Sequence, residues 1–162
     1  MKKIILFLFL ITTCINPGTT QSPSYLIWDK EKYSVEYPSQ WCVLEKPDAL
    51  SDVYIGDTKG DIGFTVLYSD TDFNLDKINR EAVSGMKKAG INPVSNEKIE
   101  INGMLFYKTV YEFPFGAIEC KQISYTTKKG NTAFNLKFGN NKTVMEQNGE
   151  LIERIVNSFK IK

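Results

Sequence analysis

The hydrophobic pattern of this chain changes its period once, in the segment 74–89. On either side of that segment, short runs alternate apolar and polar residues with a period of two, which is typical of half-buried strands. Within it, the apolar residues recur three or four positions apart, at Leu75, Ile78, Ala82, Met86 and Ala89. The pattern therefore predicts one amphipathic helix between two groups of strands, with Asp72 or Asn74 as its cap and Gly90 as its terminator.

The strand pattern falls into two groups, and a second helix follows them. Strands are predicted at 33–37, 41–45, 53–55 and 62–68 before the central helix, and at 98–101, 104–113, 119–126 and 132–138 after it. Asn102-Gly103 favours a type I′ hairpin turn, because both residues tolerate positive φ. Thr143-Val144-Met145-Glu146 has the form of a capping box at the start of the last helix, whose apolar face comprises Leu151, Ile152, Ile155, Val156 and Phe159.

This order of elements predicts an α+β domain, with helices on the faces of a mostly antiparallel sheet. The chain has 162 residues, of which 42% are hydrophobic, and this is enough for one compact domain with its own core. We expect a single domain over residues 25–162. The formal net charge is +1, so no overall field favours nucleic acid or an acidic membrane surface as a partner.

The amino-terminal residues have the pattern of an export signal. Lys2 and Lys3 form a short positive segment, and the eight residues 4–11 are all apolar. Eight residues are too few to span a hydrocarbon core, which takes about 20 in a helix, but they suit a signal peptide. We therefore predict a signal peptide at residues 1–20 and export to the periplasm or the outer cell envelope.

The end of the apolar run, Ile11-Thr12-Thr13-Cys14, resembles a bacterial lipoprotein processing site. At such a site the chain is cleaved before the cysteine and the sulfur is acylated, although Thr13 stands where these sites have Gly, Ala or Ser. The polar segment 16–23 suits a flexible tether and favours a lipid anchor at Cys14, which would attach the protein to a membrane. The alternative is ordinary cleavage near Thr20-Gln21, which would remove Cys14.

Two further cysteines, Cys42 and Cys120, lie far apart in the chain. In an oxidising compartment they could pair in a disulfide. The alternative is two buried thiols that act as small hydrophobic residues on separate strands. The sequence leaves both interpretations open.

The composition argues against an enzyme, because the chain contains no histidine. This excludes Ser-His and Cys-His nucleophiles, histidine-ligated zinc and the usual general base near neutral pH. Gly56, Gly60 and Gly63 are isolated turn glycines rather than a phosphate loop, and paired-cysteine metal motifs are absent. The segment 70–74 begins like a calcium loop, but Leu75 replaces the required glycine. We therefore expect no catalysis, no metal and no cofactor.

Aromatic side chains gather in the segment 106–115. On a strand, Tyr107, Thr109, Tyr111 and Phe113 share one face, while Phe106, Lys108, Val110 and Glu112 share the other. Most of these residues are expected in the core. Phe113, Pro114 and Phe115, followed by Gly116, are predicted to form an exposed aromatic loop that contacts a partner.

Four features, taken in order along the chain, resemble the PsbP/Mog1-like superfamily, including its exported bacterial members of unassigned role. They are "YSVEYPSQW" at 33–41, the central helix after a strand, "INGM" at 101–104 and "IVNSFKIK" at 155–162. The resemblance implies an α/β/α sandwich around an antiparallel sheet. It also implies a role in binding, since known members include an extrinsic photosystem subunit, a small-GTPase partner and envelope lipoproteins. It implies no shared active site.

Three functions are compatible with these observations. The first is a non-catalytic protein of the cell envelope that binds or assembles with a protein partner. The second is a carrier that holds an apolar ligand between sheet and helix; a cavity lined by Trp41, Tyr68 or Phe134 would favour it, and a filled core would count against it. The third is a hydrolase that uses paired carboxylates, for which the sequence shows no particular pair.

Overall fold

The computed structural model describes residues 24–162, which form two antiparallel sheets and three helices. The predicted signal peptide at residues 1–20 and Cys14 lie outside the described residues. The large sheet contains β3 (Cys42–Val43), β4 (Ser51–Gly56), β5 (Gly63–Asp70), β9 (Thr132–Asn141), β8 (Ile118–Lys129), β7 (Met104–Phe115) and β6 (Pro93–Ile101), in that spatial order. The small sheet contains β1 (Tyr25–Asp29), β2 (Tyr33–Pro38) and β10 (Lys160–Ile161). The helices are α1 (Leu75–Lys88), α2 (Lys142–Gln147) and α3 (Gly149–Ser158).

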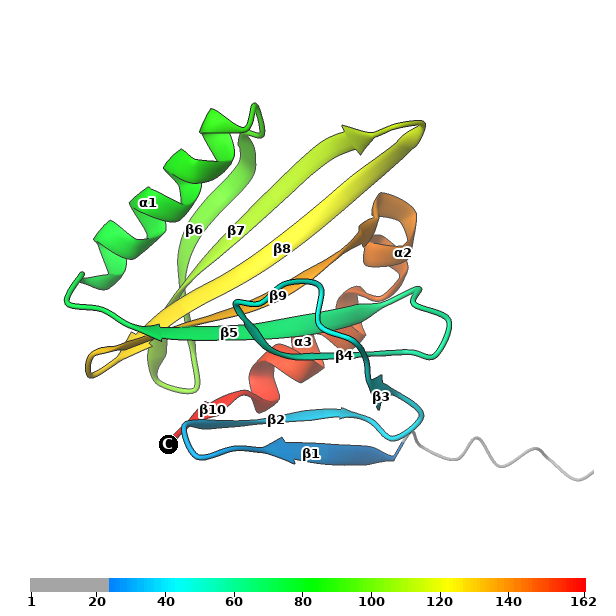
Figure 1. Cartoon of the computed structure of the whole chain (residues 1–162), viewed down its shortest axis with the longest axis horizontal. Coiled ribbons are helices and arrows are strands. Elements are labelled where there is room, and N and C mark those ends of the chain that lie inside the picture. The colour runs from blue at the N-terminus through cyan, green and yellow to red at the C-terminus, as the bar shows by residue number, and fades with distance from the viewer. Residues whose placement is uncertain (1–23) are drawn as a thin grey trace, which may run out of the picture.

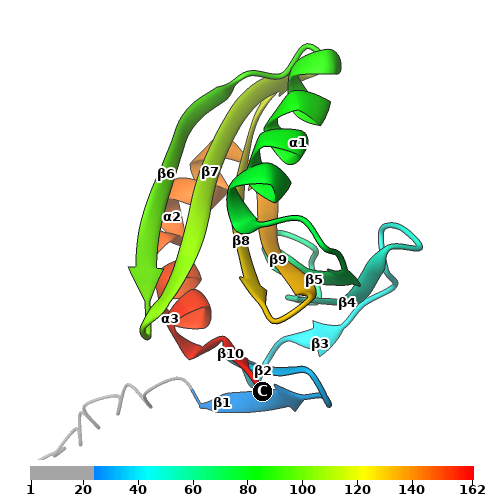
Figure 2. The ribbon, with the colours of Figure 1, turned by 90° about the vertical axis from the view of Figure 1, so that its left-hand side faces the viewer.

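The helices lie on both faces of the large sheet. Helix α1 lies on one face, beside β6, β7 and β8, and α2 and α3 lie on the other, as Figure 1 and Figure 2 show together. The small sheet lies at the end of the molecule where α3 leads into β10 (Figure 1). This arrangement is an α/β/α sandwich with a mostly antiparallel central sheet, which confirms the predicted fold class.

An aromatic layer fills the space between the large sheet and α3. The ring centroids of Phe64 and Phe138 are 5.7 Å apart, and Tyr125 stands edge-on to Phe138 at 6.3 Å. Tyr33 of β2 lies 5.6 Å from Phe159, which follows α3. All five residues are at least 97% buried, and aromatic pairs at such distances stabilise a core beyond the area they bury. The layer therefore holds the small sheet, the large sheet and α3 together.

Helix α1 confirms the helix predicted in the middle of the chain. Asn74 is its cap, and its Oδ1 accepts a hydrogen bond from the Lys77 N–H at 2.8 Å. Gly90 follows the helix with a φ of 81°, which a residue with a side chain rarely adopts. The predicted apolar stripe is not buried, however: among the residues of α1 only Asn79 is buried. Unlike a core helix, α1 therefore packs on the sheet without a fully buried apolar stripe.

The hairpin predicted at Asn102-Gly103 is also confirmed. These residues connect β6 to β7, and their φ angles are 52° and 76°, as a type I′ turn requires. In the described part of the chain, no helix is both long enough and apolar enough to cross a membrane.

The capping box predicted at Thr143 to Glu146 is wrong. Asn141 is the cap of α2, because its Oδ1 accepts a hydrogen bond from the Thr143 N–H at 2.9 Å, so Thr143 lies inside the helix. Asparagine is as good a cap as serine or aspartate, and here it precedes the threonine. The last helical segment is also divided, since α3 begins separately at Gly149.

Candidate functional site

The face of the large sheet that carries α1 holds a row of polar residues across six strands. From β4 through β5, β9, β8 and β7 to β6, the successive cross-strand partners are Tyr54, Thr65, Lys137, Ser124, Thr109 and Asn96. Partners directly opposite each other in an antiparallel pair have Cβ atoms roughly 5 Å apart. The row is therefore a continuous line of hydroxyl, amide and ammonium groups on one face.

Helix α1 covers the β6–β7 end of this row. The Thr109 hydroxyl donates to Asn96 Oδ1 at 3.1 Å and lies 3.5 Å from Oδ1 of Asn79, the buried residue of α1. One turn earlier on α1, Asp76 accepts a hydrogen bond from the Tyr107 hydroxyl at 2.8 Å. The polar groups at this end of the row are thus used to hold the helix.

The opposite end of the row lines an open hollow with a volume of about 370 Å³, to which α1 contributes no residue. Its floor includes Gly63 and Gly139, which carry no side chain. A Cβ atom at Gly63 would come within 2.7 Å of the Tyr54 ring, so the glycine lets this ring lie across β5. The side chains and loop residues around the floor include Pro47, Asp48, Tyr54, Thr65, Phe113, Cys120, Gln122 and Lys137.

Two polar groups at the hollow are not used by the fold. Thr65 is 5% exposed, and its Oγ1 has no hydrogen-bond partner in the described structure. A buried hydroxyl without a partner costs about 1–3 kcal/mol compared with one in water. Lys137 lies directly opposite Thr65, and no carboxylate of residues 24–162 comes within 4 Å of its ammonium group.

Asp48 is the carboxylate among the described lining residues. Its Oδ1 accepts hydrogen bonds from the Ser51 N–H at 2.7 Å, the Leu50 N–H at 2.9 Å and the Ser51 hydroxyl at 3.0 Å. The bonds from Ser51 are the main cause that lowers the pKa of Asp48, and the Lys137 charge adds to them. Burial raises the pKa of Tyr54. Asp48 thus stays ionised and Tyr54 stays protonated at neutral pH, which makes neither a good general acid or base there.

The predicted partner surface lies beside the hollow. Phe113 lines the hollow, whereas Phe115 is 73% exposed and Ile118 is 49% exposed at the end of the β7–β8 hairpin. Phe115 pairs with Ile118 in the strand register. The prediction that these residues form a loop is wrong. Phe113, Pro114 and Phe115 belong to β7, and the turn begins at Gly116 with a φ of 62°. The aromatic residues are thus presented on a strand end.

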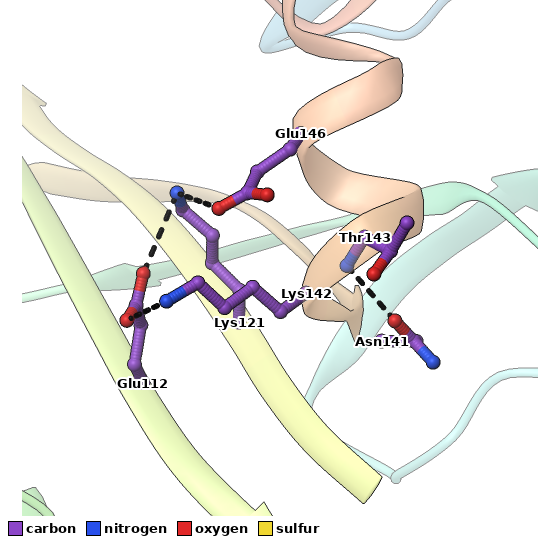
Figure 3. Close-up of polar contacts among 6 residues, drawn as sticks. All are labelled: Glu112, Lys121, Asn141, Lys142, Thr143 and Glu146. Atoms are coloured by element: carbon purple, nitrogen blue, oxygen red, sulfur yellow. Dashed lines mark hydrogen bonds and ion pairs between the residues drawn. The ribbon is translucent and has the colours of Figure 1, made fainter.

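On the other face of the sheet, an ionic cluster connects α2 to β7 and β8 (Figure 3). Glu112 pairs with Lys142 at 2.7 Å and with Lys121 at 3.5 Å, and Lys121 lies 3.8 Å from Glu146. The hydrogen bond from Lys142 is the main cause that lowers the pKa of Glu112. Two lysines balance two glutamates, so this cluster positions α2 and offers no unpaired charge to a ligand.

A second groove, between α1 and β5, is more apolar. Its volume is about 330 Å³, and its lining includes Leu50, Leu67, Tyr68, Ile78, Ala82 and Phe134. Leu50 is 78% exposed. Ile78 and Ala82, two residues of the α1 stripe that the sequence predicted to be buried, thus border this groove.

Cys42 and Cys120 are both free cysteines in the structure. Cys42 lies on β3 and Cys120 on β8, and three strands separate these two in the sheet. At about 4.8 Å for each of four strand spacings, the cysteines are roughly 19 Å apart, whereas a disulfide needs Cα atoms within about 7 Å. The structure therefore shows two separate thiols and no bridge between them.

The segment 70–74, which begins like a calcium loop, makes contacts within the protein. Asp70 accepts a hydrogen bond from the Thr132 hydroxyl at 2.6 Å and pairs with Lys32 at 3.3 Å, and Asn74 caps α1. Across residues 24–162, no three acidic or cysteine side chains are gathered as a metal site would require.

Comparison with known proteins identifies the fold. No protein-family model matches the sequence, and no curated protein matches it. The structure is similar to that of cyanobacterial PsbP (CyanoP) from Synechocystis, with a TM-score of 0.69 and 14% identity over 90% of this chain and 96% of that one. The chain has a PsbP/Mog1-like fold.

Other proteins with similar structures agree with this assignment. The PsbP/Mog1-like fold is shared with the Saccharomyces cerevisiae Ran-binding protein Mog1p, at a TM-score of 0.60 and 9% identity over 86% of this chain and 96% of that one. It is also shared with LpqN, which is involved in cell envelope biogenesis of Mycobacterium tuberculosis. The TM-score is 0.59 and the sequence identity is 12%, over 89% of this chain and 87% of that one. The predicted PsbP/Mog1-like resemblance is confirmed for the fold, which is all that identities this low show.

The sequence did not reveal the hollow. Gly63 lies in the strand predicted at 62–68 and belongs to β5, but nothing in the sequence shows that it makes room for the Tyr54 ring. The period of two places Thr65 and Lys137 on the faces of their strands opposite Phe64 and Phe138, and this is the signal that separates them from the aromatic core. Only the pairing of β5 with β9 makes them neighbours.

The same substitution at two buried threonines should change stability in opposite directions. Thr65→Val removes a hydroxyl that has no partner, so we expect the free energy of unfolding to rise by about 1 kcal/mol. Thr127→Val removes a hydroxyl that donates to the Leu105 carbonyl at 2.6 Å, so we expect a loss of about 1–2 kcal/mol. Urea denaturation measures both. A loss of stability in Thr65→Val similar to that in Thr127→Val would contradict the absence of a partner for Thr65.

The ionic cluster should make stability depend on pH in acid. Since the folded-state pKa of Glu112 is lowered, its ionised form stabilises the fold above the usual carboxyl range, and this contribution is lost as the pH falls. We expect Glu112→Gln to lower the melting temperature at pH 7 and to flatten its dependence on pH between about 5 and 3. Glu31→Gln, at an exposed carboxylate outside the cluster, is the control and should change neither. An unchanged acid profile in Glu112→Gln would show that the cluster does not contribute.

Proposed function

We propose that this protein is a non-catalytic accessory protein of the cell envelope that binds a protein partner. The observation that carries the proposal is the end of the β7–β8 hairpin, where Phe115 and Ile118 are exposed next to the hollow. Exposed aromatic residues beside a concave surface with a few polar groups are typical of binding sites. The partner is expected to contact both the hairpin end and the hollow.

The similar structures and the chemistry of the hollow support this proposal. Mog1p is a Ran-binding protein, and LpqN is involved in cell envelope biogenesis. The export signal predicted at residues 1–20 supports an envelope location, with a lipid anchor at Cys14 as part of the proposal. Asp48 is the single carboxylate among the described residues around the hollow, so a hydrolase that uses paired carboxylates is not proposed there.

A crosslinker placed at Phe115 tests the protein-binding function. With a photo-crosslinking amino acid at position 115, irradiation of intact cells should give one dominant covalent adduct with an envelope protein, because this side chain would lie at the interface. The matched control is position 105, since Leu105 is a 51% exposed apolar residue at the other end of β7. The adduct should be absent when the crosslinking residue is at position 105. It should also be lost when the protein with the crosslinking residue at position 115 carries Ile118→Asp as a second substitution. The absence of an adduct at position 115, or the same adducts from both positions, would contradict the proposal.

A carrier of an apolar ligand is the second candidate, and the groove between α1 and β5 is the observation that favours it. The space between the large sheet and α3 is filled, since Trp41 is 5% exposed and packs 6.3 Å from Phe64, and Phe134 is 2% exposed. A ligand would therefore have to lie in the groove bordered by Ile78 and Ala82.

Filling that groove tests the carrier function. If the protein is a carrier, it should bind the uncharged fluorescent probe N-phenyl-1-naphthylamine, and Ala82→Trp should abolish the binding by occupying the groove. Ala89→Trp places the same side chain at the exposed end of α1 and should leave binding intact. Probe binding that survives Ala82→Trp, or that is absent from the wild type, would exclude this candidate.

A further inference from the structure

The end of the polar row that α1 leaves open contains a buried hydroxyl group, on Thr65, that the fold does not require. Thr65 is buried, and its hydroxyl has no partner in the described structure, although valine has nearly the same shape and would need none. The large majority of buried polar groups in native proteins have a hydrogen-bond partner, so an unpaired one calls for an explanation, and a bound water, ion or ligand is one. Because Thr65 lines the hollow, such a partner would have to come from a molecule in the hollow.

The charge beside Thr65 indicates which kind of group would be bound. Lys137 is the cross-strand partner of Thr65, so an ammonium group and a hydroxyl group lie side by side on the same face. Both donate hydrogen bonds, and in the described structure the ammonium group forms no ion pair. A ligand oxygen that carries negative charge would satisfy both donors at once.

The rim of the hollow limits the charge of that ligand. Asp48 lies there as a carboxylate held on its loop by bonds from Leu50 and Ser51. Its negative charge opposes a second negative charge in the hollow, so a dianionic phosphate is disfavoured. Of the two lysines around the hollow, Lys121 is paired with Glu112 and Glu146, and Lys137 forms no ion pair in the described structure. The charge of Lys137 and the hydroxyl of Thr65 suit a group with a single negative charge.

The remaining walls of the hollow are partly apolar. Phe113 and Pro47 line it, and Gln122 contributes a further polar side chain. A volume of about 370 Å³ lies at the lower end of the range for small-ligand sites. The hollow therefore has room for a charged group together with a small apolar body.

We propose that this hollow binds a carboxylate group attached to an apolar body. The carboxylate lies between Lys137 and Thr65, and the apolar body packs against Phe113. This inference deepens the proposed binding function and rests on it. The same chemistry is offered by the last residue of a protein chain and by a small free carboxylic acid.

Two matched probes separate a carboxylate site from a site for any aromatic molecule. N-acetylphenylalanine carries the carboxylate without an amine, and phenylalaninamide carries the amine without a carboxylate. In calorimetry with the full chain, we expect the acid to bind at least about tenfold more tightly than the amide, because only the acid can pair with Lys137. Equal affinities, a preference for the amide, or no binding of the acid would overturn the proposal.

Variants of the two donors test their roles. Lys137→Met and Thr65→Val should each weaken binding of the acid, by about tenfold or more for the lysine and by several-fold for the threonine. Lys137→Arg should retain most of the affinity, since it keeps the positive charge. Lys160→Met removes the same charge from an exposed position on β10 and should leave the affinity unchanged. Unchanged affinity in Lys137→Met would place the ligand elsewhere and overturn the proposal.

Cys120 reports directly on where the ligand binds. It lines the hollow as a free cysteine, whereas Cys42 on β3 is not among the lining residues. We expect bound N-acetylphenylalanine to slow the alkylation of Cys120 by iodoacetamide, measured by mass spectrometry of peptides, and to leave the rate at Cys42 unchanged. Equal rates at Cys120 with and without a saturating concentration of the acid would contradict binding in the hollow.

A short peptide that ends in phenylalanine distinguishes the two sources of the carboxylate. Tighter binding of the peptide with a free carboxyl end than of N-acetylphenylalanine, and its loss on amidation of that end, would assign the site to the end of a protein chain. Binding of the acid without binding of the peptide would assign it to a small acid. If neither N-acetylphenylalanine nor the peptide binds while position 115 still gives a specific adduct, the carboxylate site is overturned and the proposed protein-binding function stands. If a carboxylate binds but position 115 gives no adduct, the hollow is a carboxylate site and the protein-binding function is overturned.

Discussion

The main hydrophobic core of the large sheet lies on only one of its faces, where aromatic residues pack toward α3, and the rest of the structure depends on this. Phe64, Tyr125 and Phe138 point toward α3, where Tyr33 and Phe159 complete the layer. Because burial on this side supplies the main driving force for folding, the opposite face does not have to be apolar. That face instead carries the row from Tyr54 to Asn96, which a two-sided core would not tolerate.

Helix α1 is the visible result of this asymmetry. A helix on an apolar face buries a stripe of leucine, isoleucine or methionine, whereas α1 buries Asn79 and is held by polar contacts with the sheet. Its position over β6, β7 and β8 leaves the β4–β5–β9 part of the face open. The same polar row therefore serves as a support for a helix at one end and as the floor of a hollow at the other.

What could be predicted from the sequence was local. The helix at α1 and the Asn102-Gly103 turn depend on neighbours within a few residues, and both were correct. The loop predicted at Phe113 to Phe115 was wrong, because these residues continue β7. The capping box failed because Asn141 competes for the same amide groups. Strands β1 and β10 were not predicted, and both pair with β2. The sequence of β1 does not alternate apolar and polar residues, and β10 has only two residues and so has no period. Thr65 and Lys137 meet through the pairing of distant strands, which no local pattern encodes.

The way the chain enters the domain has a mechanical consequence. Strand β1 buries none of its residues and pairs with β2 along five positions, whereas β2 contributes Tyr33 and Val35 to the core. Traction applied ahead of Tyr25 would reach the β1 ladder before the aromatic layer around Tyr33 and Phe159. Peeling β1 away would release about 17 Å of chain and still leave the aromatic layer closed. Under load, this strand would give way first, and the hollow would keep its shape while the chain lengthened.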